Sequence, residues 1–172
     1  VVRDLTIDGG ANDRAVLVRA GASMVLERAV LREGASPQGA LVGAFGDLTV
    51  RGARLSDASG ANGCVYIGDD ARLDAHGLHV SNCTSTALGG ALQVIGVDPV
   101  TLVGARLESN QADFGGGLSV GAQSSVTATG SWLSGNDATS EGGGAHVQAG
   151  GALTLVDSWA ASNTSTVGGA VS

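Results

Sequence analysis

The sequence is poor in several residue types on which common protein classes depend. Its 172 residues include no lysine, 2 prolines and 3% aromatic residues, and only 15% are charged. Without lysine, the chain can have neither lysine Schiff-base chemistry nor the phosphate-binding loop that needs this residue. Two prolines are too few for a collagen-like chain. With 16 acidic against 9 basic residues, the net charge of −7 argues against a nucleic-acid-binding surface.

Long apolar segments are missing as well. No run approaches the roughly 18–20 apolar residues of a membrane span, and no basic segment followed by an apolar one heads the chain. The chain begins with Val1 and stops at Ser172, inside a repeat that is described below. We therefore expect a fragment of a longer protein, with any export signal or membrane anchor outside it.

Glycine, in contrast, is abundant. The 29 glycines make up about 17% of the chain, against a usual level of roughly 7%. This content is too high for a helical protein. Disorder is also excluded, because 43% of the residues are apolar and few are charged. The length suits one domain.

A repeat of 24–27 residues runs along the chain. The segments that begin at residues 24, 48, 73, 100, 126 and 153 overlay directly. A second column of apolar residues recurs at nearly the same intervals along the chain. Its members are Val16, Ala40, Val65, Leu92, Leu118, Ala145 and Val171. Two columns that share one step pattern make chance similarity a poor explanation.

Within each repeat, apolar residues alternate with polar ones, which predicts β-strands. A bend follows at Gly52, Gly77, Gly104 and Gly130, with Arg28 and Asp157 as exceptions. Glycine at such a bend indicates a positive φ or a close backbone approach. Three short strands in each repeat, each with an inward apolar column, predict an all-β fold: a right-handed, single-stranded parallel β-helix. Equal positions in successive coils should form ladders about 4.8 Å apart.

The whole chain, residues 1–172, is then one solenoid domain of about six to seven coils. We expect a partial coil over 1–15, full coils over 16–39, 40–64, 65–91, 92–117, 118–144 and 145–170, and the start of another at 171–172.

The later coils end in a narrower pattern, an asparagine followed by Gly-Gly and a small or apolar residue. It occurs over residues 110–118, 136–145 and 163–171, and more loosely over 82–92. This pattern resembles the polymorphic outer membrane protein repeat, which pairs an FxxN-like element with a GGA element. Leu107, Leu133 and Ala160 stand where that family has phenylalanine. The resemblance covers roughly residues 78–172 and implies a surface-displayed passenger domain, often an adhesin, with no catalytic residues to carry over.

The same pattern also has a structural explanation. An asparagine at a strand end can hydrogen-bond the neighbouring backbone, and stacked asparagines can bond one another. Paired glycines allow a sharp return into the next strand. We expect these roles for Asn110, Asn136, Asn163, Gly116, Gly143 and Gly169.

One outward column combines cationic and aromatic residues. It comprises Val30, Arg54, His79, Arg106, Trp132 and Trp159. Aromatic rings stack on sugar faces, and arginine binds hydroxyl or carboxylate groups, so the last five members are candidate ligand-binding residues. The alternative is that the two tryptophans only stabilise the wall of the solenoid.

Right-handed β-helices also include polysaccharide lyases and hydrolases, whose sites need clustered carboxylates. Glu33 and Asp57 share a column, and Asp69, Asp70 and Asp74 lie close in sequence. No coil combines several outward acids with a base, so we expect no catalytic residues and treat such an enzyme as the alternative. Asp74 and His76 share an outward face and His79 lies just past the bend, but no second histidine stands at ligand spacing, so we expect no metal site and no cofactor.

Cys64 and Cys83 form neither a CxxC motif nor a zinc spacing. Both are predicted on the same side of neighbouring coils, where a disulfide is possible and would suit an exported protein.

The sequence therefore predicts a β-helix fragment at the cell surface, on a bacterial outer membrane or in the extracellular medium. It would serve adhesion or recognition, or act as a stalk. The expected partners are a glycan or protein on a host or neighbouring cell, or another copy through end-to-end association. No nucleic acid is expected, and a membrane only through parts outside this fragment.

Overall fold

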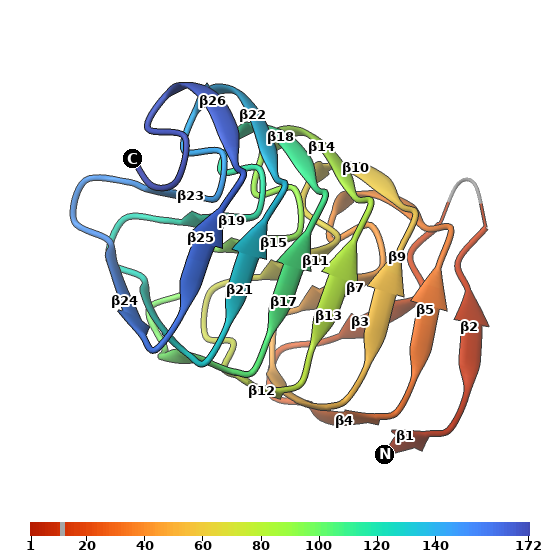
Figure 1. Cartoon of the computed structure of the whole chain (residues 1–172). Helices are drawn as coiled ribbons and strands as arrows, with labels where there is room; N and C mark the ends of the chain where they lie inside the picture. Colours follow the sequence, from red (N-terminus) through yellow and green to blue (C-terminus); the bar gives the residue numbers. More distant parts are fainter. Residues whose placement is uncertain (11–12) are drawn as a thin grey trace.

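A computed structural model of the chain shows an all-β parallel solenoid of about six coils (Figure 1). It describes residues 1–10 and 13–172. The described residues form no helix, and so none that is long and apolar enough to cross a membrane. Of the expected partial coil over 1–15, residues 11 and 12 lie outside the described residues.

The strands build four walls, named here in the order in which a coil passes through them. Wall 1 contains β1 (Val2–Arg3), β4 (Ser23–Glu27), β8 (Asp47–Arg51), β12 (Leu73–His76), β16 (Val100–Val103), β20 (Ser125–Thr129) and β24 (Ala152–Val156). Wall 2, in front in Figure 1, contains β2 (Thr6–Asp8), β5 (Val30–Arg32), β9 (Arg54–Ser56), β13 (His79–Ser81), β17 (Arg106–Glu108), β21 (Trp132–Ser134) and β25 (Trp159–Ala161).

Wall 3 contains β6 (Ala35–Gln38), β10 (Ser59–Asn62), β14 (Thr84–Leu88), β18 (Gln111–Phe114), β22 (Asp137–Glu141) and β26 (Thr164–Val167). Wall 4 contains β3 (Val16–Val18), β7 (Val42–Ala44), β11 (Val65–Ile67), β15 (Leu92–Val94), β19 (Leu118–Val120) and β23 (Ala145–Val147). In every wall, neighbouring strands belong to successive coils and pair in parallel.

The three strands expected in each coil form walls 1, 2 and 4. Wall 3 comes from the segment that was expected to be only the closing turn. Its strands carry polar residues and its pairing shifts register, for example between Ala112 and Phe114, so it has no regular alternation that would predict a strand.

The core is a stack of aliphatic levels. On wall 1, Leu48, Leu73, Val100 and Val126 are paired in register and almost fully buried. The second expected column, with Val65, Leu92 and Leu118, forms the inner face of wall 4. Burying one such side chain contributes roughly 1.5–3 kcal/mol before entropy is counted. Most core positions hold Leu, Val or Ala, and the narrow levels leave little room for aromatic rings.

One expected member of the second column, Ala40, was wrong, because Val42 pairs with both Val16 and Val65. A shift of two residues keeps the apolar alternation, so the pattern alone could not detect it.

The bend from wall 1 to wall 2 explains one glycine column. Gly52, Gly77 and Gly104 have φ values of 67, 64 and 59°, where a side chain is disfavoured. The next bend, from wall 2 to wall 3, is also left-handed but admits polar residues. Those present are Glu33, Asp57, Asn82, Ser109 and Ser162.

Candidate functional site

The outer face of wall 2 carries the cationic and aromatic column in continuous register. Arg54 pairs with His79, His79 with Arg106, Arg106 with Trp132 and Trp132 with Trp159. The central residue of each strand is buried in the core, so its neighbours on either side face outward. The structure therefore places the five candidate side chains in a single row along the solenoid axis.

At one end of this row, the two tryptophans stack on each other. Their ring centroids are 5.3 Å apart and the rings are inclined by 14°. Arg106 covers the other side of Trp132, with its guanidinium carbon 5.2 Å from the ring centroid. Both faces of Trp132 are therefore occupied within the wall, whereas Trp159 is covered on one face.

This stacking changes what the tryptophans offer a ligand. Trp132 is 37% exposed and Trp159 is 56% exposed. Since Trp132 lies between Arg106 and Trp159, it presents its edge rather than its face. Stacking a sugar ring flat on Trp132 is therefore blocked, and among the described residues only Trp159 keeps a face that no neighbouring side chain of the row covers.

Beside the row, the glycine bends leave a shallow hollow of about 250 Å³. Its lining consists of Gly52, Gly77, Gly104, Leu78, Arg54, His79 and Arg106. A Cβ atom on Gly104 would meet nothing within 4 Å, which shows how open the hollow is above the bend. The basic members of the row thus stand along the rim of a groove that the missing glycine side chains create.

The charges around the hollow are only partly compensated. Glu108 lies on the same wall, with Oε2 3.1 Å from His79 Nε2 and Oε1 3.8 Å from Arg106 Nη1. The His79 contact is close but poorly aligned, since Nε2 has no hydrogen-bond partner among the described residues. Arg54 forms no ion pair with any described residue and stays free to bind an anion.

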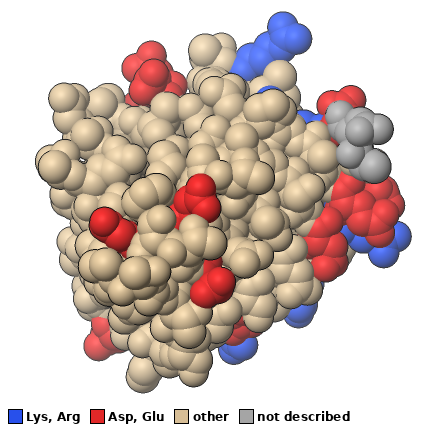
Figure 2. Space-filling view, turned by 90° about the horizontal axis from the view of Figure 1, so that it is seen from above, with Lys and Arg blue, Asp and Glu red and all other residues tan. Residues whose placement is uncertain are grey.

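Wall 3 has the opposite character. Its strands carry Asp113, Asp137 and Glu141. Figure 2 looks on to the molecule from this side and shows scattered acidic side chains, with basic ones only towards the margins. Wall 2 has Arg32, Arg54 and Arg106 on its strands, whereas the described strands of wall 3 contain no arginine.

The asparagines of the closing motif form a ladder inside the solenoid. Asn136 Oδ1 accepts bonds from the backbone N–H and the side-chain amide of Asn110, both at 3.0 Å. Asn163 Oδ1 likewise accepts bonds from the backbone N–H of Asn136 at 2.9 Å and from its side-chain amide at 3.1 Å. Each of these amides also donates to a carbonyl of the preceding coil, as Asn136 does to Leu107 at 2.8 Å. These residues are part of the scaffold.

The paired glycines of the motif lie where the neighbouring backbone comes very close. A Cβ atom on Gly116 would lie 2.4 Å from the Asp137 carbonyl oxygen, and one on Gly143 would lie 2.2 Å from that of Thr164. Neither position can hold a larger residue without moving the backbone. At Gly169 the nearest atom, the Asn163 carbonyl oxygen, would be 3.0 Å away. The motif is required by close packing at this corner.

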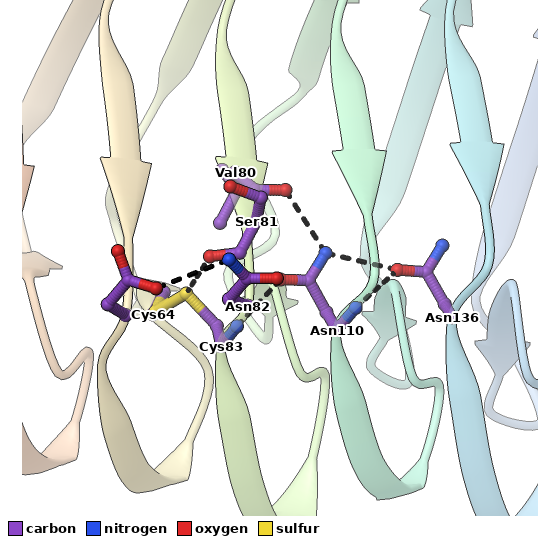
Figure 3. Close-up of a disulfide and its surroundings, with 8 residues drawn as sticks. Cys64, Val80, Ser81, Asn82, Cys83, Asn110 and Asn136 are labelled. Atoms are coloured by element: carbon purple, nitrogen blue, oxygen red, sulfur yellow. Dashed lines mark hydrogen bonds between the residues drawn. A yellow bond between two sulfur atoms is a disulfide. The ribbon is translucent and has the colours of Figure 1, made fainter.

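A disulfide joins Cys64 and Cys83 at the end of the asparagine ladder (Figure 3). Both residues are about 1% exposed. The Cys83 backbone N–H donates to Asn110 Oδ1 at 3.1 Å, so the cysteine stands where the next asparagine would be. The covalent bond and the amide ladder close the same corner of successive coils.

This register corrects one alignment made from the sequence. The loose motif over residues 82–92 predicts Asn82 at the level of Asn110, but the pairing of Ser81 with Glu108 and of Thr84 with Gln111 puts Cys83 there. Asn82 lies at the preceding left-handed bend, with φ of 54°. Asparagine suits both positions, for different reasons.

Of the five acids named above as possible catalytic groups, four lie at bends or form ion pairs. Glu33 and Asp57 occupy left-handed bend positions, and Asp57 accepts a hydrogen bond from Asn82 at 3.2 Å. Asp70 also has a positive φ, of 57°. Asp74 lies on wall 1, 2.9 Å from Arg51 and 3.1 Å from His76.

The possible metal ligands are not brought together. His79 faces Glu108 on wall 2, away from the contacts that Asp74 and His76 make on wall 1. Within the part of the chain that the structure describes, no three His, Cys, Asp or Glu side chains are grouped so as to hold a metal ion.

Sequence reasoning missed one further cluster, on the outer side of wall 4. Residues 117–121 have the Gly-x-Ser-x-Gly spacing, and Ser119 pairs with His146, whose Nδ1 lies 3.7 Å from Glu141 Oε2. Ser119 lies within a strand paired on both sides, not on the strand-to-helix turn that this motif needs. At 1% exposure, its hydroxyl cannot meet a substrate.

Comparisons of the chain with models of protein families, with curated protein sequences and with solved structures found no match.

Proposed function

We propose that this solenoid is a recognition module that binds carbohydrate on the outer face of wall 2. The observation that carries the proposal is the row from Arg54 to Trp159 beside the glycine hollow. Arginine and tryptophan are suited to sugars, because guanidinium groups bond hydroxyls and carboxylates and indole rings pack on apolar sugar faces. The shallow hollow suits an elongated ligand better than an enclosed small molecule.

Surface display or secretion is part of the same proposal. A buried disulfide is typical of proteins that reach an oxidising compartment. The Asn and Gly-Gly pattern resembles repeats of surface-displayed outer membrane proteins, which supports an adhesive role. The alternatives are a stalk without a ligand and a polysaccharide-active enzyme.

Binding of the purified chain to a glycan array tests the proposal. We expect Trp132→Ala with Trp159→Ala, and separately Arg54→Gln, to reduce binding of the captured glycans at least several-fold. Val167→Ala is the control for removing an exposed apolar side chain, because Val167 is 55% exposed on wall 3. Circular dichroism and thermal unfolding must show that each variant is folded.

Two results would contradict the proposal. If no glycan is captured, the stalk becomes the better account. If glycans are captured equally well by all variants, binding occurs elsewhere on the molecule. Release of a shortened or unsaturated sugar during the assay would instead support the enzyme.

A further inference from the structure

The basic members of the row recur with a defined spacing. Arg54 and Arg106 are both paired with His79, so they stand two coils apart. With strands about 4.8 Å apart, their backbones are separated by about 9.5 Å along the axis. In an extended polysaccharide, two consecutive sugars cover about this length.

The electrostatics favour acidic groups at these two positions. Arg54 has no ion pair among the described residues, and Arg106 is only partly neutralised by Glu108 at 3.8 Å. Between them, His79 is already close to Glu108, at 3.1 Å. An anion is therefore favoured at the first and third coil of the hollow more than at the middle one.

The hollow also sets the direction of the ligand. It is lined by the bends of three successive coils, Gly52, Gly77 and Gly104, and so extends along the solenoid axis. Beyond Arg106 the same row continues with the edge of Trp132 and the exposed ring of Trp159. A linear chain lying along the axis would contact all of these groups in sequence.

From this geometry we infer that the ligand of wall 2 is a linear acidic polysaccharide with a carboxylate on every second sugar. It lies along the axis, with one carboxylate on Arg54 and the next on Arg106. The guanidinium fork matches a carboxylate in two hydrogen bonds. This inference rests on the proposed function and specifies its ligand.

The test measures binding of hyaluronan hexasaccharide by calorimetry, with neutral chitohexaose as the comparison. We expect Arg54→Gln and Arg106→Gln each to weaken hyaluronan binding about tenfold, the usual effect of losing a charge-assisted hydrogen bond. Arg19→Gln, which removes an equal charge outside the hollow, should change little. Raising the salt concentration should also weaken binding.

A variant that should bind more tightly tests whether the weaker binding of the arginine variants comes from misfolding. Glu108→Gln removes the acid beside His79 and Arg106, so hyaluronan should bind several-fold more tightly and chitohexaose should be unaffected. A hyaluronan disaccharide, which cannot reach both arginines, should bind far more weakly than the hexasaccharide.

The possible failures are distinguishable. If chitohexaose binds as well as hyaluronan and only the tryptophan variants lose it, recognition at wall 2 stands and the acidic ligand is wrong. If only one of the two arginines matters, the two-coil spacing is wrong. If neither sugar binds, the acidic-polysaccharide inference is overturned, and the glycan array decides whether the proposed function falls with it.

Discussion

At the scale of single residues, the structure shows how polar groups are accommodated in a narrow core. Asn136 is fully buried, yet its side-chain oxygen accepts two hydrogen bonds and its amide donates two. A buried amide with all its partners adds specificity, whereas one that loses them is costly. The outward residues face a different requirement, since they determine what the surface can bind.

Asn136→Ala should destabilise the chain by about 2–4 kcal/mol, because it leaves the Asn110 backbone N–H buried without its acceptor and removes the bonds from the Asn136 amide to the Leu107 carbonyl and to Asn163. Urea unfolding followed by circular dichroism measures the change. Gln111→Ala, which removes an exposed side chain at 3.4 Å from Asp137, should cost far less. An equal loss in the free energy of unfolding for the two variants would show that the buried asparagine ladder contributes no more to stability than an exposed side chain.

The Arg51–Asp74 pair predicts a dependence on pH. The hydrogen bond from Arg51 holds the pKa of the Asp74 carboxyl below its ordinary value. Its contribution to stability is therefore present above the unfolded-state pKa and is lost as the pH falls through the lower folded-state pKa. Since Asp74 is 35% exposed, we expect at most about 1 kcal/mol.

Comparing wild type with Asp74→Asn at pH 7 and below pH 3 checks this sign. The variant should be slightly less stable at pH 7, and the difference should shrink in acid. A difference that grows as the pH falls would mean that the pair does not stabilise the folded state.

At the scale of elements, the same corner of the coil is closed by a disulfide in one coil and by asparagine hydrogen bonds in others. Cys83 and Cys64 are 19 residues apart. Asn136 and Asn163 have Gly117 and Gly144 at the matching position, where a Cβ atom would lie 3.0 and 2.9 Å from the asparagine amide. Asn110 has Ala91 at this position, so the asparagines face only glycine or alanine, whereas the disulfide fills the same space covalently.

Cys64→Ala with Cys83→Ala should lower the free energy of unfolding by about 3 kcal/mol, the value typical of a disulfide that closes a short loop. Cys64→Gly with Cys83→Asn extends the ladder by one coil, so we expect it to recover part of that loss. Chemical denaturation of the three proteins gives the comparison. A thiol count of two in the denatured, unreduced protein would refute the disulfide itself.

The sequence was informative about elements wherever a buried column set their register. Leu55, Val80, Leu107 and Leu133 fix the strands of wall 2, so the outward row beside them could be predicted correctly. Wall 3 was not predicted as a strand, because its polar residues and register shifts hide the alternation. The hollow was missed as well, since it arises from side chains that the bend glycines lack.

At the scale of the whole molecule, the solenoid is a regular frame that presents the outward residues of each wall at a constant spacing. Backbone ladders set the spacing, while the outward residues can vary without disturbing the core. The sequence pattern predicted that Trp132 and Trp159 face outward, but it could not predict that the two exposed rings stack on each other. Wall 2 thereby combines a stacked aromatic pair with a basic groove.

The most direct test of recognition on wall 2 uses the fact that both tryptophans of the chain lie there. Hyaluronan hexasaccharide is titrated while tryptophan fluorescence is recorded, and calorimetry measures binding in parallel. We predict a saturable change in emission with the same midpoint as the heat, shifted to higher concentration in Arg54→Gln. Heat of binding without any change in emission would contradict a site on this wall.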